Sequence, residues 1–476
     1  MVLKVPGIIG GDEVWGNALF VDLDPSTGQP LAEVARLGER DVDAAVSAAR
    51  EASEKYRKTS ASSRADLLHQ LAALIRRDAD RLADLETRDV GKPLRQAKAD
   101  VTVCARYFDY YASILLALHG DTLPPMDGML AFTRREPFGV TGHITPWNYP
   151  LQMAARTVAP SLAAGNCAVL KPAEDAPLST VEIARLALEA GFLPGVLNVV
   201  PGFGHEAGAA LTAHPGVDHL SFTGSRQVGT TVATAAAQNV VPVVLELGGK
   251  SPNLVFKDAD LELAIPLIVG AITQNSGQTC SAGSRLLVHE SLRSEVVQEV
   301  KARFQRMSLG PGLDDADLGP LISSKQRQRV SDLVETGRSE AELVCGGKPP
   351  VKSNLQGGFF YEPTLFDGVS ATATIAQQEI FGPVLGVTTF RDDDEALTIA
   401  NSTDFGLVAA IWTSDIRRAH RLAEEVRAGQ VFINTYGAGG GVEMPFGGWK
   451  RSGYGREKGF EGLLAYTQTK TVAVGL

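Results

Sequence analysis

The sequence predicts an α/β fold that contains a parallel sheet. Three observations lead to this prediction. Apolar residues recur at spacings of three and four over residues 41–119, short β-branched runs alternate with helical stretches from about residue 139, and a second α/β region begins near Gly248. Because strands that alternate with helices form βαβ units, the crossovers should be right-handed and ligands should bind at the carboxyl ends of the strands.

The N-terminal segment, residues 41–119, is predicted to be mostly helical. Asp41 and Ser60 are suitable N-caps, since a side-chain oxygen there accepts a hydrogen bond from the first turn. The predicted strands that follow cover residues 140–145, 167–170, 196–200, 219–222 and 241–245. The predicted helices between them cover residues 180–190, 206–213 and 228–237.

The second region contains a helical stretch at residues 264–274, the loop that carries Cys280, and a helix from Ser291. A glycine-rich segment at residues 437–448 follows. It leads to a final alternating run, residues 465–474, which we predict to be an exchanged or docked edge strand.

The composition is typical of a globular protein. The chain has 476 residues, enough for two to four domains, and a net charge of -10, which argues against a nucleic-acid or anionic-membrane partner. Its four cysteines form no C-x-x-C pair, so a structural zinc site or a disulfide framework is not indicated. The N-terminus has no signal-peptide pattern, and the apolar stretch at residues 261–273 is short and contains Pro266. We therefore expect a cytoplasmic protein without a metal site.

Cys280 and Glu246 form the strongest candidate reacting pair. Cys280 is flanked by small residues that leave space around its sulfur, and Glu246 precedes two glycines that let the backbone approach a ligand. Together they offer a nucleophile and a general base. A lone cysteine is more often a small buried hydrophobic residue, so the pair alone does not establish an enzyme.

Three further motifs follow predicted strands. The Phe222–Ser225 turn lies where a strand meets a helix, and N–H groups at a helix start can bind a pyrophosphate. Lys171 and Glu174 follow another strand and can hold ribose hydroxyls, although a solvated charged loop is the more usual interpretation. Asn148 lies in a proline-rich turn, where its amide can stabilise an oxyanion or simply form the turn.

These motifs occur in one order, and with it the chain resembles the aldehyde dehydrogenase superfamily, specifically its non-acylating, NAD(P)-dependent members. The resemblance covers nearly the whole chain. The motifs that carry it are ITPWNYP (144–150), KPAE (171–174), FTGS (222–225), ELGGK (246–250), GQTC (277–280), QEIFGPV (378–384) and PFGGWKRSGYGRE (445–457).

The resemblance implies a three-part fold and a homodimer or homotetramer. A Rossmann-like NAD domain would comprise residues 1–119 and 139–247, and an α/β catalytic domain residues 248–457. A small β oligomerisation arm would comprise residues 120–138 and 458–476.

The resemblance also assigns the chemistry. The Cys280 thiolate would add to an aldehyde, and the side-chain amide of Asn148 with the Cys280 N–H would hold the oxyanion. Hydride loss would leave a thioester, which water activated by Glu246 would hydrolyse. A free thiol titrates near about 8.5, so Cys280 needs local activation.

The cofactor implied by the resemblance is NAD, with NADP as the alternative. Lys171 and Glu174 would contact the adenine ribose, and the Glu174 carboxylate would repel a 2′-phosphate, which favours NAD. Ser225 would contact the pyrophosphate and Glu379 the other ribose. The remaining residues expected at the cofactor site are Ile144, Thr145, Pro146, Trp147, Phe222, Gly224, Gly248 and Phe381.

The resemblance leaves the substrate open. The residues expected to line the aldehyde tunnel are Tyr149, Met153, Arg156, Thr279, Ser281, Gly440 and Phe446. Arg156 occupies a position where succinate-semialdehyde dehydrogenases bind the substrate carboxylate, but Gln274 replaces the second arginine of that subfamily. Arg156 is therefore either a clamp for an acidic aldehyde or the partner of an internal carboxylate. The glycines of residues 437–441 instead favour a wide tunnel mouth that admits aromatic or terpenoid aldehydes.

Three other functions compete with this one. A CoA-acylating semialdehyde dehydrogenase is disfavoured because Glu246 is present. A cysteine hydrolase would need a histidine partner, and no histidine spacing in the sequence marks one. A catalytically silent binding or structural member is disfavoured by Cys280, Glu246 and Asn148 together.

Overall fold

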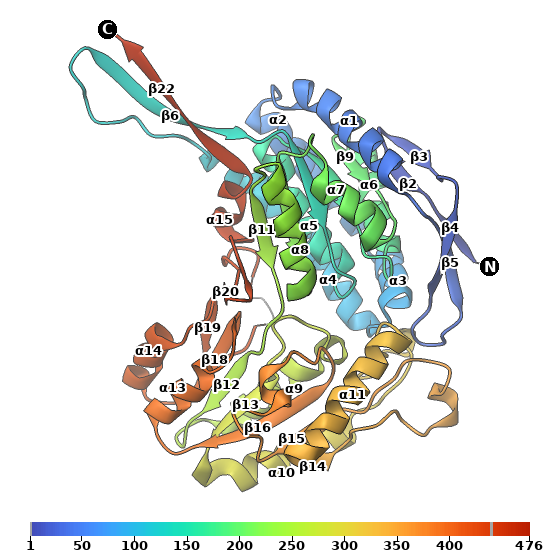
Figure 1. The fold of residues 1–476 in the computed structure, drawn as a ribbon, viewed down its shortest axis with the longest axis vertical. Helices are drawn as coiled ribbons and strands as arrows, with labels where there is room; N and C mark the ends of the chain where they lie inside the picture. The colour runs from blue at the N-terminus through green and yellow to red at the C-terminus, as the bar shows by residue number, and fades with distance from the viewer. Residues whose placement is uncertain (1, 438–440) are drawn as a thin grey trace.

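The computed structural model describes residues 2–437 and 441–476 and shows two sheet-containing lobes with a long hairpin that leaves the body (Figure 1). The chain begins with five short strands. They are β1 (Leu3–Val5), β2 (Gly7–Ile9), β3 (Asp12–Val14), β4 (Leu19–Leu23) and β5 (Pro30–Ala35), of which β1, β5 and β4 form a small sheet. These strands were not predicted from the sequence, because each is short and most of their exposed residues are apolar.

Four helices follow, as the apolar spacing predicts. They are α1 (Glu39–Tyr56), α2 (Ala61–Arg77), α3 (Ala79–Val90) and α4 (Leu94–Ile114). Ser60 is the N-cap of α2, and its hydroxyl accepts from the Ser63 N–H at 3.1 Å. The prediction for Asp41 is wrong, because Gly38 is the N-cap of α1 and Asp41 lies one turn inside, where its carboxylate accepts from the Gly38 N–H at 2.9 Å.

The first large sheet has the strand order β21-β11-β10-β7-β8-β9-β2-β3. Its parallel centre consists of β7 (Val140–Ile144), β8 (Cys167–Lys171), β9 (Leu197–Val199), β10 (His219–Thr223) and β11 (Val243–Glu246). The helices around it are α5 (Pro150–Ala164), α6 (Leu178–Glu189), α7 (Ala209–Ala213) and α8 (Arg226–Gln238). The predicted strands are confirmed to within two residues.

The strand order reverses at β7, and this reversal places the functional site. Strands β8 and β9 lie on one side of β7, while β10 and β11 lie on the other. In open α/β sheets a crevice forms at such a point, beyond the carboxyl ends of the strands. One apolar cluster packs α1 to α6 against this sheet and makes it a rigid support.

The second large sheet has the order β14-β15-β16-β13-β12-β18-β19. Its strands are β12 (Pro252–Val255), β13 (Arg285–His289), β14 (Glu342–Cys345), β15 (Thr364–Asp367), β16 (Val384–Phe390), β18 (Val408–Trp412) and β19 (Gln430–Ile433). Its helices are α9 (Leu261–Thr273), α10 (Arg293–Arg306), α11 (Ser324–Glu340), α12 (Thr374–Gln377), α13 (Asp393–Asn401) and α14 (Ile416–Glu425). Except at the antiparallel edge strand β14, neighbouring strands run parallel.

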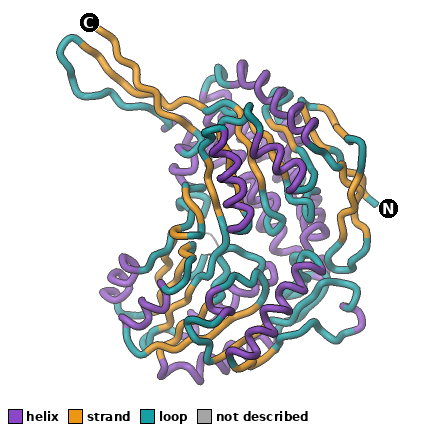
Figure 2. The backbone as a smooth tube through the Cα atoms, viewed as in Figure 1, coloured by secondary structure: helices purple, strands orange, loops and turns teal. Residues whose placement is uncertain are grey.

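The C-terminal part of the chain returns to the first lobe. Short strands β17 (Phe405–Gly406) and β20 (Trp449–Lys450) pair, and β21 (Gly453–Tyr454) joins the first sheet beside β11. Helix α15 (Gly459–Leu464) then leads to β22 (Thr467–Gly475), which pairs along its whole length with β6 (Met129–Pro137). This hairpin points away from the body, and most of its residues are exposed (Figure 2). In the described ranges, no helix is long and apolar enough to cross a membrane.

Candidate active site

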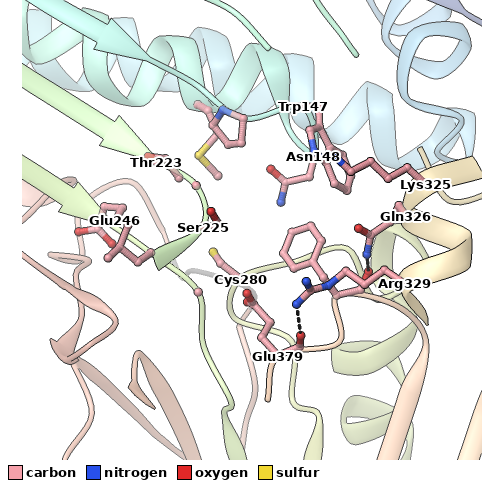
Figure 3. A pocket seen from close by; sticks show the side chains of 16 residues that line it. Trp147, Asn148, Thr223, Ser225, Glu246, Cys280, Lys325, Gln326, Arg329 and Glu379 are labelled. Atoms are coloured by element: carbon pink, nitrogen blue, oxygen red, sulfur yellow. Dashed lines mark hydrogen bonds between the residues drawn. The ribbon is translucent and has the colours of Figure 1, made fainter. Parts of the chain in front are cut away.

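A cavity of about 300 Å³ lies at the carboxyl ends of β7, β10 and β11 and is closed from the other side by residues of the second lobe (Figure 3). The side chains of Cys280, Asn148 and Glu246 all line it. The other lining residues are Pro146, Trp147, Met153, Thr223, Gly224, Ser225, Leu247, Gly248, Lys325, Gln326, Arg329, Glu379 and Phe381. Motifs that lie far apart in the sequence therefore meet at one cavity.

Cys280 is presented by a tightly held loop. Asn275, Ser276 and Gly277 all have positive φ, at 47°, 55° and 75°. A Cβ added at Gly277 would lie 2.2 Å from the carbonyl oxygen of Gly382, so only glycine fits there. Left-handed backbone at three successive positions costs free energy and persists only where the surroundings hold it. Here the Ser276 hydroxyl donates to the Gly319 carbonyl at 2.7 Å.

Asn148 is tied to the same loop. Its Nδ2 donates to the Gln278 carbonyl at 2.9 Å, and its own carbonyl accepts from Asn275 Nδ2 at 2.9 Å. A side-chain amide has two N–H donors, so one remains for a ligand in the cavity. In Figure 3 the Asn148 amide points into the cavity toward Cys280. This geometry suits a donor to an oxyanion formed on the Cys280 sulfur.

Burial raises the pKa of the half-buried Cys280 thiol to about 11. The Arg156 and Lys458 cations oppose this rise, whereas the carboxylates of Glu379 and Glu246 add to it. The thiol is therefore protonated at neutral pH in this arrangement. A reaction at Cys280 needs an acceptor for its proton.

Glu246 ends β11 in a fully enclosed position. Burial and the nearby Glu457 carboxylate raise its pKa well above the usual range, while the Arg156 cation lowers it. Neither carboxylate oxygen has a hydrogen-bond partner in the described part of the chain. The Glu246 carboxylate points away from the Cys280 sulfur in Figure 3.

Arg156 forms an ion pair with Glu246, and it is also paired with a second carboxylate. Its Nη2 lies 3.8 Å from Glu246 Oε2, while its Nε donates to the Glu457 carboxylate. Its guanidinium also lies over the Phe446 ring, 4.5 Å from the centroid. Arg156 is only 2% exposed and does not line the cavity. Of the two interpretations of Arg156, the contacts agree with pairing to an internal carboxylate, because Glu457 occupies this arginine.

Lys458 and Glu457 are further buried charged residues near Arg156 and Glu246, and neither was predicted to belong to the site. Burial lowers the pKa of Lys458 to about 7, and its ammonium lies 5.1 Å from the centre of the Phe446 ring. Glu457 also accepts from the Ser221 hydroxyl at 3.0 Å. The sequence signal that could have identified them is their position, since Glu457 ends the PFGGWKRSGYGRE motif and Lys458 directly follows it.

The cofactor-side candidates divide into two groups. Pro146, Trp147, Gly224, Ser225, Gly248, Glu379 and Phe381 line the cavity, whereas Ile144, Thr145, Phe222, Lys171 and Glu174 do not. Phe222 lies directly under Gly224, where an added Cβ would meet its ring at 2.6 Å. Lys171 Nζ lies 2.7 Å from Glu174 Oε2, next to the cavity-lining β7 turn but outside the cavity itself.

Ser225 and Glu379 have well-defined partners. Ser225 is the N-cap of α8, and its hydroxyl accepts from the Val228 N–H at 3.4 Å. Glu379 accepts from the Gly249 N–H at 3.0 Å, and burial raises its pKa to about 7. Phe381 has a positive φ of 61° and meets the Trp147 ring edge-on, with centroids 5.3 Å apart.

Helix α11 contributes three lining residues that the sequence analysis missed. Lys325, Gln326 and Arg329 recur at helical spacing on the face toward the cavity. Gln326 Nε2 donates to the Phe381 carbonyl at 2.7 Å, and Arg329 donates to the Glu379 carbonyl at 2.9 Å. Such a polar helix face looks like a solvated surface in the sequence, so no local signal marks it.

Of the expected tunnel residues that the structure describes, only Met153 lines this cavity. The Tyr149 hydroxyl lies 2.8 Å from the Thr279 hydroxyl, and both residues are buried. Ser281 is buried, and its carbonyl accepts from the Tyr436 hydroxyl. Phe446 packs under Arg156, and Gly440 lies outside the described residues, as do Ala438 and Gly439 of the same glycine-rich loop.

Comparison with known proteins gives consistent matches along the chain. The family model described as "Aldehyde dehydrogenase family" matches residues 16–472. The chain is 44% identical to retinal dehydrogenase 2 of Homo sapiens over 97% of this chain and 90% of that protein. It is 43% identical to betaine aldehyde dehydrogenase of Bacillus subtilis over 94% of this chain and 93% of that protein. The NAD+ complex of an aldehyde dehydrogenase from Bacillus cereus superposes with a TM-score of 0.97 at 41% identity, covering 99% of this chain and 97% of that one.

Proposed function

The chain belongs to the aldehyde dehydrogenase family, and on that premise we propose that it oxidises an aldehyde to a carboxylic acid through a thioester on Cys280. One observation carries the proposal. Cys280, Asn148 and Glu246, which come from three separate segments, line the same cavity beside the N-terminus of α8. A nucleophile, an oxyanion donor and a carboxylate base are the groups that this reaction requires.

The cofactor proposed is NAD, and the cavity has features that fit it. Helix α8 has 13 residues, and the first N–H groups of such a helix can hold a pyrophosphate beside Ser225. The Thr223 hydroxyl is buried at the cavity wall with no hydrogen-bond partner among the described residues, which leaves it available to a ligand. Glu379 and Gln326 would contact the ribose nearer the reaction. When bound, the nicotinamide supplies the hydride acceptor.

Cys280 would act as the nucleophile once its proton has left. Burial raises the pKa of the thiol to about 11 although two cations lie near it, so at neutral pH a proton acceptor has to take the thiol proton. Arg156 and Lys458 both favour the thiolate. Addition to the aldehyde carbon moves the negative charge from sulfur to oxygen. The free N–H of Asn148 Nδ2 would then stabilise this oxyanion before hydride is lost.

Glu246 would activate the water that hydrolyses the thioester. Its carboxylate now points away from Cys280 and toward Arg156, so it has to rotate toward the sulfur for this step. Its raised pKa makes this carboxylate a stronger base than an ordinary glutamate. Hydrolysis rather than transfer to CoA is proposed because this carboxylate is present.

The substrate proposed is an aldehyde that carries no carboxylate. Arg156 is neutralised by Glu457 and approached by Glu246, so an acidic substrate would find its expected cation already occupied. Breaking a buried ion pair to admit a new anion costs several kcal/mol, roughly 3–5. An aromatic or terpenoid aldehyde remains the candidate, since Met153, the expected tunnel residue that lines the cavity, is apolar.

We also propose the domain and assembly assignments. The two large sheets belong to the NAD domain and the catalytic domain, and the β6–β22 hairpin is the oligomerisation arm of a homodimer or homotetramer. Met129, Leu130 and Val474 are exposed on this hairpin, and a second copy of the chain would cover them.

The test is NADH formation by the purified protein with neutral and acidic aldehydes of equal length, with NAD or NADP, and with or without CoA. We expect turnover with NAD and a neutral aldehyde, no dependence on CoA, and a carboxylic acid as product. Cys280→Ala should abolish it, with Cys104→Ala as the matched control at a thiol that does not line the cavity. Turnover that survives in Cys280→Ala would overturn the proposal.

A further inference from the structure

A buried lysine outside the cavity is linked to both sides of the reacting centre. We propose that Lys92 is a positioning residue that holds Tyr149, and through it Thr279, so that Asn148 and Cys280 keep their relative placement. The proposal rests on the proposed function for its catalytic meaning. Its structural content is independent of that function, because it concerns the order of the loop that carries Cys280.

Lys92 lies in the turn between α3 and α4 with two carboxylates as partners. It is 1% exposed, and its ammonium donates to Glu86 Oε1 at 3.0 Å and forms an ion pair with Asp100. Glu86 and Asp100 are also buried. A charge in such surroundings is tolerated only when it is paired, so these three side chains hold one another at fixed positions.

The same carboxylates hold the beginning of α5. Glu86 Oε2 accepts from the Leu151 N–H at 3.2 Å and from the Ser179 hydroxyl at 3.2 Å. Asp100 Oδ1 accepts from Gln152 Nε2 at 2.5 Å. Negative charge at the first turn of a helix is stabilised by the helix dipole and by its unpaired N–H groups. The network therefore fixes the point where the ITPWNYP turn enters the helix.

Lys92 also contacts the residue that follows Asn148. Its ammonium lies over the Tyr149 ring, 4.2 Å from the centroid, which is within the range of a cation–π interaction. The Tyr149 hydroxyl lies 2.8 Å from the Thr279 hydroxyl. Tyr149 is adjacent to Asn148 and Thr279 is adjacent to Cys280. The Tyr149 side chain therefore connects the segment that carries the oxyanion donor with the segment that carries the nucleophile.

A second contact from α4 reinforces this link. Gln96 Oε1 accepts from the Asn275 N–H at 2.9 Å, in the part of the nucleophile loop with left-handed backbone. A loop in strained conformation stays in place only when its neighbours hold it. Lys92 and Gln96 therefore support the loop from the N-terminal helices, and neither of them lines the cofactor cavity.

The experiment compares Lys92→Met, which keeps the length but removes the charge, with Lys92→Arg and Tyr149→Phe in the full-length protein. Hydrogen exchange of the peptide covering residues 274–282 reports the loop directly and needs no activity. We expect its exchange to quicken about tenfold in Lys92→Met and in Tyr149→Phe, with α10 unchanged and partial recovery in Lys92→Arg.

Steady-state kinetics supply the second readout. A misplacement of about 1 Å can cost about 10²-fold in rate, so kcat should fall by that order in Lys92→Met while KM for NAD stays within about twofold. The double variant Lys92→Met/Tyr149→Phe should be no slower than Lys92→Met alone, because both changes break one link. A merely structural lysine would instead lower the melting temperature and leave kcat intact.

Specific outcomes overturn the inference. Unchanged hydrogen exchange of residues 274–282 in Tyr149→Phe would overturn the proposed role of Lys92. Because Tyr149→Phe keeps the buried charges, it can be measured even if Lys92→Met does not fold. If the losses in kcat of the two single variants multiply in Lys92→Met/Tyr149→Phe, the two residues act independently, which would also contradict the inference. A wild-type protein inactive toward every aldehyde would contradict the proposed function, while the exchange result would still decide the role of Lys92.

Discussion

The guanidinium of Arg156 and the carboxylate of Glu246 lie 3.8 Å apart in the interior of the protein, between Nη2 and Oε2. On its other side Arg156 binds Glu457, so one cation serves two carboxylates. Burial is the main reason that the pKa of Glu246, the proposed general base, is raised; Glu457 raises it further and Arg156 lowers it. The pairing with both carboxylates also explains why Arg156 is unavailable to a substrate.

The first prediction concerns the pH dependence of turnover. A general base works when deprotonated, so kcat should rise with pH through the pKa of Glu246. Arg156→Gln removes the cation that lowers this pKa, and the rise should move to higher pH. Glu457→Gln is the matched control, and it should move the rise to lower pH. Profiles of kcat against pH that coincide in all three proteins would contradict the assignment.

A second prediction separates the two chemical steps. Glu246→Gln keeps the shape of the side chain but cannot accept a proton, so acylation should proceed and hydrolysis should stall. Rapid mixing with a neutral aldehyde should give a burst of about one NADH per active site, followed by slow turnover. Mass spectrometry should show the acyl group on Cys280. Loss of the burst itself would mean that Glu246 acts before the thioester forms.

Asn148→Ala should slow hydride transfer by about 10²–10³-fold, the effect of removing one oxyanion donor. The side chain also donates to the Gln278 carbonyl, so the loop needs a separate check. Alkylation of Cys280 by iodoacetamide reports whether the thiol remains accessible, and it should stay within about threefold. A rate loss below tenfold would indicate that another group holds the oxyanion.

Glu174 is predicted to decide between NAD and NADP. Although burial raises its pKa, the Lys171 ammonium lowers it overall, so the carboxylate is ionised at neutral pH and repels a 2′-phosphate. Glu174→Gln should raise kcat/KM for NADP about tenfold relative to NAD. The partly buried carboxylate of Glu206, which pairs with Arg36, offers a control, since Glu206→Gln should leave the ratio unchanged. An unaltered ratio in Glu174→Gln would place discrimination elsewhere.

The fifth prediction concerns stability in acid. Burial lowers the pKa of His143 and of His219 to about 3. The unfolded chain binds these protons below about pH 6.5 and the folded chain does not, so stability is full above that pH and falls toward pH 3. Urea unfolding should show a loss of about 1.4 kcal/mol per pH unit for each histidine. His143→Phe should reduce the slope, whereas His205→Asn at the surface should not.

Much of the fold was predictable because it depends on short-range patterns. Apolar spacing predicted the mostly helical segment that contains α1 to α4, though not the boundaries of each helix, and β-branched runs located the parallel strands β7 to β11. The second sheet was harder, because its strands come from segments as distant as β12 and β19 and few carry an alternating pattern. Ser60 was identified as a cap from its type, but Asp41 showed that an acidic residue near a helix start can serve equally well one turn inside.

By itself the sequence determined which residues carry reactive groups and which family they resemble, since Cys280, Asn148 and Glu246 lie in contiguous motifs whose local backbone suits their chemistry. Only the tertiary structure decided what surrounds them. Arg156 meets Glu457 across a separation of 301 residues, and Lys92 reaches Tyr149 through the packing of α3, α4 and α5. The physical reason is that the energy of a buried charge depends on which partners packing brings within a few ångströms, and no local pattern records that choice.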